Sequence, residues 1–205
     1  MTTIECVSAA GEALPPLVIF KGKDFTPLWL PEAGSEEDTR YWEWRASDKG
    51  WTSDYLAFEW LTSIFQPRTV PANPNERRLL ILDGHGSHLK SPFIGFCIQH
   101  AIDLMVLPSH SSHMTQPLDV GIFGPLKREL TSYADKSAVF NAGRISKSEW
   151  ATNLVKARKK AMSKDNIMVG WKNTGLSPFA PFRVLRKVPT PSTPTQDSPS
   201  TLVHL

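Results

Sequence analysis

Residues 79–88 read Leu-Leu-Ile-Leu-Asp-Gly-His-Gly-Ser-His, an apolar run that ends in an aspartate and closely spaced glycines. Four consecutive apolar residues bounded by a polar turn predict a short strand that is buried on both faces. An acid that directly follows such a strand is held by a rigid element, and the glycines let a ligand approach the backbone. This stretch therefore predicts a site at the end of a buried strand, with Asp83 as its candidate residue.

The segments ahead of this strand predict a hairpin and a helix. Residues 2–8 and 17–20 have the β-branched and apolar content of two paired strands. Thr52 or Ser53 can cap a helix whose apolar residues recur at helical spacing, and Pro67 should end that helix.

The segments after this strand predict a second helix and strand, and then a helical region. Ser91-Pro92 opens a helix, and residues 102–107 predict another buried strand, so the alternation favours parallel pairing in an α/β fold. Residues 146–170 predict one helix capped by Ser146. We expect one domain over residues 1–188 and a disordered Pro/Ser/Thr tail over residues 189–205.

Asp119 is the second candidate, 36 residues after Asp83, where a polar loop gives way to a predicted helix. Carboxylates that converge from the ends of such elements can bind Mg²⁺, which prefers hard oxygen ligands. Spacing alone favours a simpler interpretation, in which Asp83 caps a turn and Asp119 caps a helix.

Composition and charge limit the class of protein. No apolar run approaches the roughly 20 residues of a membrane-spanning helix. Cys6 and Cys97 form neither a metal-type pair nor a disulfide framework, so a reducing compartment is expected. Residues 1–126 carry 9 Lys and Arg against 15 Asp and Glu, whereas residues 127–187 carry 14 against 4. The basic half predicts a polyanionic partner or, alternatively, a solvated helical surface.

The sequences around both aspartates resemble a known family. Residues 79–88, quoted above, and residues 107–127, Leu-Pro-Ser-His-Ser-Ser-His-Met-Thr-Gln-Pro-Leu-Asp-Val-Gly-Ile-Phe-Gly-Pro-Leu-Lys, are similar to the DDE endonuclease domain of the pogo, Tigger and Jerky transposases, relatives of centromere protein B. Residues 4–22, 50–61 and 170–178 are similar to the hairpin, a helix and the closing segment of that family, so the resemblance covers residues 3–181.

The resemblance implies an RNase H-like α/β fold, a mixed sheet flanked by helices, and metal-dependent cutting and joining of DNA. It assigns Asp83 and Asp119 as the second and third catalytic, metal-binding carboxylates. The first carboxylate should lie on a strand just upstream of Thr3, so we expect the chain to lack that strand. Mg²⁺ or Mn²⁺ binding should then be weakened, and the isolated chain should not cut DNA.

DNA is the partner that the resemblance implies, with the nucleus as the location and a homodimer as a common arrangement. Membranes and small-molecule substrates are not expected as partners. His85 and His88, which lie around the carboxylates, and Lys127 and Arg128, in the basic half, are candidates for contacting DNA. The run Lys156, Arg158, Lys159 and Lys160 offers further phosphate contacts.

Several alternatives stay open at the level of the sequence. The pairs His85/His88 and His110/His113 could hold zinc, although four imidazoles without a thiolate would be an unusual structural site. The alternating tryptophans Trp42 and Trp44 could stack on unpaired bases, whereas packing is the simpler interpretation. The chain could also be a domesticated, non-catalytic DNA- or protein-binding module, or a nuclease whose first carboxylate comes from another chain.

Overall fold

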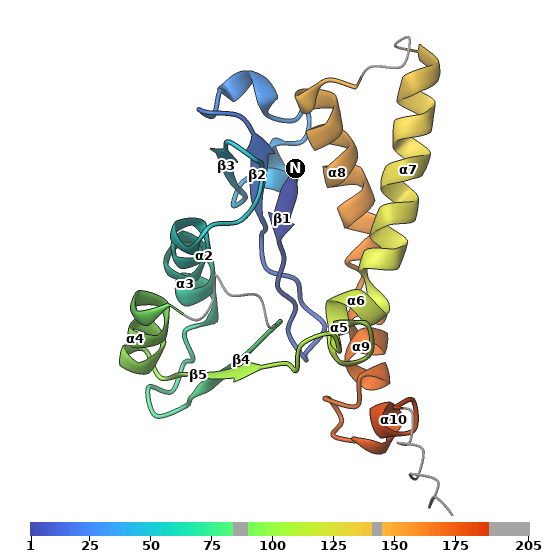
Figure 1. The fold of residues 1–205 in the computed structure, drawn as a ribbon. Coiled ribbons are helices and arrows are strands. Elements are labelled where there is room, and N and C mark those ends of the chain that lie inside the picture. The colour runs from blue at the N-terminus through green and yellow to red at the C-terminus, as the bar shows by residue number, and fades with distance from the viewer. Residues whose placement is uncertain (84–89, 141–144, 189–205) are drawn as a thin grey trace, which may run out of the picture.

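The computed structural model describes residues 1–83, 90–140 and 145–188. Figure 1 shows the described strands in two small sheets, with helices around them. The first sheet has the order β1-β2-β3, and the second consists of β4 and β5. The strands are β1 (Thr2–Ile4), β2 (Leu17–Lys21), β3 (Glu43–Ser47), β4 (Arg78–Leu82) and β5 (Ile102–Val106).

The pairing of the strands gives the fold a mixed α/β character. β1 and β2 are antiparallel, as the predicted hairpin requires, whereas β3 runs parallel to β2. β4 and β5 are parallel and are joined through a helix, which confirms the predicted strand–helix–strand unit. The architecture is that of an RNase H-like α/β fold, although the described strands form two sheets and not one continuous sheet.

The helices occupy both sides of β2. They are α1 (Glu36–Thr39), α2 (Asp54–Trp60), α3 (Gln66–Thr69), α4 (Ser91–Gln99), α5 (Ser112–Thr115), α6 (Pro117–Gly121), α7 (Phe123–Phe140), α8 (Lys147–Ala161), α9 (Lys164–Asn173) and α10 (Phe182–Leu185). A 3-10 turn, Pro27–Trp29, and a π-helical segment, Leu61–Phe65, complete the helical elements of the described residues.

β2 is buried on both faces, which explains its continuous apolar sequence. Leu17 and Ile19 pack into a core with α2, β4 and α4. Val18 and Phe20, on the opposite face, pack against α7 and α8. The strand therefore lies between two helical layers, as a period of two residues along a strand dictates.

Two helix boundaries differ from those expected. The helix capped by Ser53 does not end at Pro67, because the π-helical segment leads into α3, which contains Pro67 and ends at Thr69. Pro67 lies in the first turn of α3, where its missing N–H costs little. Residues 146–170 form two helices: Ser146 caps α8 as expected, and Ser163 caps a separate helix, α9.

Candidate active site

Asp83 directly follows β4, and the pairing of β4 with β5 fixes its position. Leu82 lies opposite Val106 at the end of the parallel ladder, and the Leu82 carbonyl accepts a hydrogen bond of 2.8 Å from the Leu107 N–H. Asp83 is half-buried. The residue therefore lies at the end of a parallel strand pair, as its sequence predicts. The predicted burial on both faces is wrong, because Leu80 and Leu82 are buried whereas Leu79 is exposed.

Asp119 lies in the first turn of α6, a helix that begins at Pro117 and not at Asp119 itself. Its position depends on a close crossing of α6 and α9. A Cβ atom on Gly121 would lie 2.7 Å from Gly170 Cα, so the two helices touch through their backbones. The glycines let α6 approach α9 closely, and this packing places the first turn of α6, which carries Asp119.

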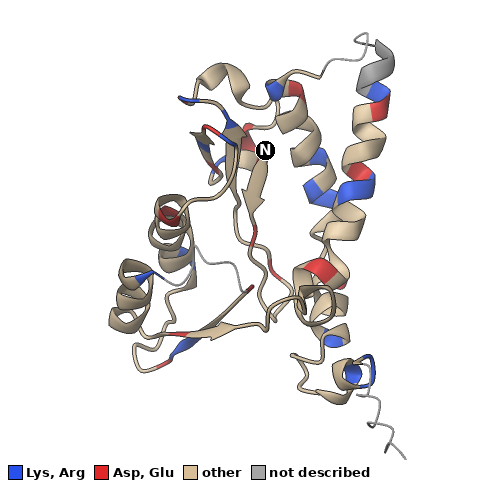
Figure 2. Cartoon of the chain, viewed as in Figure 1, with Lys and Arg blue, Asp and Glu red and all other residues tan. Residues whose placement is uncertain are grey.

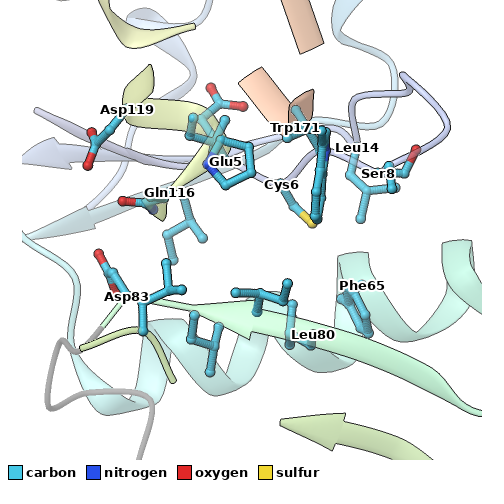
Figure 3. A pocket seen from close by; sticks show the side chains of 18 of the residues that line it. Glu5, Cys6, Ser8, Leu14, Phe65, Leu80, Asp83, Gln116, Asp119 and Trp171 are labelled. Carbon is cyan, nitrogen blue, oxygen red and sulfur yellow. The ribbon is translucent and has the colours of Figure 1, made fainter. Parts of the chain in front are cut away.

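Asp83 and Asp119 line the same cavity, which has a volume of about 1080 Å³. Figure 3 shows both carboxylates at one end of this cavity, with the amide of Gln116 between them in that view. The structure thus brings together two carboxylates that are 36 residues apart in the sequence. Simple capping roles do not require this convergence.

The donor atoms at this end of the cavity fit a hard divalent cation. Mg²⁺ in proteins usually takes one or two carboxylates and leaves its other positions to water and substrate phosphate. Asp83, Asp119 and the amide oxygen of Gln116 supply that kind of donor. Among the residues that the structure describes, no three His, Cys, Asp or Glu side chains are grouped so that they could hold a metal ion.

The cavity lies between the two sheets. All residues of β1 and all residues of β4 line it, and neither strand pairs with a further described strand on that side. Glu5 directly follows β1 and is half-buried. Its side chain is fully buried, so the surface that it exposes belongs to the backbone. The cavity therefore presents strand edges as well as carboxylates.

Glu5 also lines the cavity, and its role was not foreseen. Its buried carboxylate forms an ion pair of 3.0 Å with Arg158 of α8, which also donates to the Leu14 carbonyl. Burial raises the pKa of Glu5, and the Arg158 guanidinium opposes that rise. The pair ties β1 to α8, so Arg158 is not placed to contact DNA. The sequence around Glu5 contains no motif that predicts a buried, ion-paired acid at this position.

The other basic candidates differ in their surroundings. Lys127 and Arg128 are exposed on α7, and no ion pair with a described residue is recorded for either. Lys159 and Lys160 form exposed ion pairs with Asp38 and Glu129. Figure 2 shows Lys and Arg along α7 and α8 and again near α10.

The histidines and the tryptophans named as candidates lie in different surroundings. His85 and His88 lie outside the described residues, whereas His110 and His113 are exposed, His110 with a positive φ of 61°. Trp42 and Trp44 stack on each other at 5.5 Å. Trp44 is buried in the core that contains Phe20, and Trp42 packs against that core while half-buried, which supports the packing interpretation.

A family model of DDE superfamily endonucleases matches residues 1–171, which include both aspartates and nearly all of the cavity wall. The chain belongs to the DDE superfamily of endonucleases. These endonucleases are in general dependent on a divalent metal, and the donor atoms at Asp83 and Asp119 agree with that property.

Similar proteins support the pogo group within this superfamily. The chain is 29% identical over 126 residues to the human pogo transposable element with KRAB domain, a match that covers 62% of this chain and 19% of that protein. It is 27% identical over 124 residues to the human pogo transposable element with ZNF domain, covering 60% and 8%.

A further relative bears the name of a transporter. The chain is 34% identical over 188 residues to "MFS-type transporter clz9" of Cochliobolus lunatus, which covers 92% of this chain and 20% of that protein. The chain thus spans a fifth or less of these relatives. Within the described residues, no helix has the length and apolar character needed to cross a membrane. No solved structure gives a significant match to the chain.

Proposed function

We propose that this chain is the DNA-processing domain of a pogo-type transposase, with Asp83 and Asp119 as its metal-holding carboxylates. The observation that carries the proposal is the convergence of these two residues on one cavity. A bound Mg²⁺ or Mn²⁺ would activate water and stabilise the leaving oxygen of a phosphodiester. Asp83, at the end of β4, and Asp119, on α6, would hold the ion, while DNA phosphates complete its coordination.

We further propose that residues 1–205 by themselves bind the metal weakly and do not cut DNA. Two-metal cleavage needs a ligand that bridges both ions, and the family motifs match only two carboxylates in this chain. Two carboxylates also offer a divalent cation fewer charged oxygen ligands than three, so the affinity for the ion is lower. Without that ligand, the attacking water and the leaving oxygen would not be held in line, and the cleavage rate would fall.

A nicking assay with supercoiled DNA and Mg²⁺ or Mn²⁺ tests the absence of cleavage. We expect no nicking above background. Robust nicking that Asp83→Asn abolishes would overturn the proposed inactivity while supporting the catalytic assignment.

Titration of Mn²⁺, followed by electron paramagnetic resonance, tests the metal assignment without relying on activity. Asp83→Asn and Asp119→Asn should each weaken binding further. Asp103→Asn is the matched control, because Asp103 is an exposed carboxylate on β5 that pairs with Arg77 outside the cavity. Equal binding by the wild type and Asp83→Asn would exclude the proposed site.

A second candidate function is a domesticated DNA- or protein-binding module without catalysis. The observation that favours it is the basic half of the chain, with 14 Lys and Arg against 4 Asp and Glu over residues 127–187. DNA binding that needs no metal and survives Asp83→Asn would favour this candidate.

The first carboxylate could instead come from another polypeptide. The edges of β1 and β4 along the cavity, which pair with no further strand within residues 1–83, 90–140 and 145–188, support this third possibility, because exposed strand edges can pair with added strands. Cleavage that appears only after a peptide carrying a strand and an aspartate is added would favour it.

We propose that four further residues contact the DNA phosphates: His85, His88, Lys127 and Arg128. A DNA substrate implies the nucleus as the location, which imaging of a tagged chain would test. We also propose a homodimer, for which light scattering of the purified chain gives the direct measurement.

A further inference from the structure

Trp51 lies in the connection between β3 and α2, and its side chain is 70% exposed. It lines the same cavity as Asp83 and Asp119. Single exposed aromatic residues are common on protein surfaces and need no special explanation. Trp51 differs because it is exposed and also lines the cavity that contains Asp83 and Asp119.

The backbone of Trp51 is held in place although its ring is exposed. The Ser47 hydroxyl accepts a hydrogen bond of 3.0 Å from the Trp51 N–H and donates one of 2.9 Å to the Trp51 carbonyl. The preceding residue, Gly50, has a φ of +71°, and its carbonyl accepts a 2.8 Å hydrogen bond from the Thr2 hydroxyl. The turn is therefore fixed to both β3 and β1.

An exposed indole on a turn whose backbone is fixed is suited to binding a flat ligand. Tryptophan has only two side-chain torsions to order, so it offers a large contact area at a low entropic cost. Its uncharged face can also attract a nucleobase next to two carboxylates, whereas those carboxylates repel the phosphates of the same strand. A stacked base would offset that repulsion without adding a cation.

We propose that Trp51 stacks on an unpaired base of the DNA and so positions the adjacent phosphodiester at Asp83 and Asp119. This inference rests on the proposed DNA-processing function. Bases within a duplex already stack on their neighbours, so only an unpaired or extruded base presents a free face. Trp51 is thus a positioning residue that distinguishes frayed or single-stranded DNA from intact duplex.

Fluorescence anisotropy with the full chain tests this inference on two labelled DNAs, a fully paired duplex and the same duplex with a single-stranded overhang. Trp51→Ala should weaken binding to the overhang DNA about 5- to 150-fold, the range for one stacked base. Its affinity for the paired duplex should stay unchanged. Trp51→Phe should retain most of the overhang affinity, because it keeps an aromatic face.

Tyr55→Ala is the matched control. Tyr55 is 72% exposed and lies four residues away on α2, but it does not line the cavity. This variant should bind both DNAs like the wild type, and thermal melting should show that all variants are folded. If Trp51→Ala unfolds, Trp51→Leu takes its place, because leucine keeps apolar bulk without an aromatic face and should lose overhang affinity while Trp51→Phe retains most of it.

Three outcomes would overturn the inference. One is overhang binding by Trp51→Ala that equals that of Tyr55→Ala, and another is an equal loss on both DNAs. These two leave the proposed function intact, because the wild type still binds DNA. A wild type that binds neither DNA overturns the proposed DNA-processing function together with the role of Trp51.

Discussion

Gly121 of α6 and Gly170 of α9 are in direct backbone contact. A Cβ atom on Gly170 would lie 2.5 Å from the carbonyl oxygen of Pro117, and one on Gly121 would lie 2.7 Å from Gly170 Cα. Both distances are too short for a methyl group. The crossing of these helices holds Asp119 against the cavity, so it links helix packing to the candidate active site.

Gly170→Ala should therefore destabilise the fold and displace Asp119. Overpacking a tight contact costs about 1–3 kcal/mol, which outweighs the gain of roughly 1 kcal/mol from the better helix propensity of alanine. Urea denaturation measures the change. Gly95→Ala on α4 is the control, because nothing lies within 4 Å of its Cβ position, and it should stabilise the protein. Equal stability of the two variants would contradict the predicted contact.

Arg158→Met should lower the free energy of unfolding at neutral pH by about 3–5 kcal/mol, because it leaves the Glu5 carboxylate buried without a counter-charge. Combining it with Glu5→Gln should recover much of the loss. Arg77→Met provides the exposed comparison, since the Arg77–Asp103 pair is solvent-accessible and should contribute no more than about 1 kcal/mol. Chemical denaturation of the four proteins decides the point.

The Glu5 carboxyl should make stability fall as the pH rises. Burial raises its pKa above the ordinary value of 4.5, so the folded state holds this proton at pH values where the unfolded chain has lost it. The free energy of unfolding should thus decrease between pH 4.5 and the raised pKa and then level off. Subtracting the pH profile of Glu5→Gln isolates this group. A difference that does not vary with pH would show that the pKa is unshifted.

Neither cysteine should react readily with thiol reagents in the folded protein at pH 8. Burial raises the pKa of Cys6 to about 12, with a smaller contribution from Glu5, and burial raises that of Cys97 to about 11. Only the thiolate reacts, so both side chains should stay inert until the protein unfolds. A colorimetric thiol titration with and without denaturant measures this. Cys6 is half-buried and lines the cavity, so rapid labelling of Cys6 without denaturant would show that the pKa of its thiol is not raised.

Exchanging Lys127 and Arg128 for glutamine should weaken DNA binding and make it less sensitive to salt. Each phosphate contact contributes about −0.9 to the slope of log K against log salt concentration, so the double variant should reduce the slope by about 2. Lys159→Gln, whose amine pairs with Asp38, is the control and should change the slope less. An unchanged slope in the double variant would remove these residues from the DNA interface.

The parts of the fold that local sequence controls were predictable. The hairpin of β1 and β2, the parallel pair β4 and β5, and the cap at Ser146 all follow from side-chain periodicity and capping chemistry. The continuation of the helix through Pro67 was missed, because a π-helical segment is set by tertiary packing and not by the local pattern.

The sequence alone determined which residues could carry the chemistry: Asp83 at the end of an apolar strand, and Asp119 within a long family motif. Only the tertiary structure decided that both line one cavity, that Gly121 and Gly170 bring α6 against α9, and that Arg158 is paired with Glu5. Arg158 and Glu5 are 153 residues apart. Propensity and periodicity act over a few neighbouring residues, whereas contacts across such separations depend on how whole helices and strands pack.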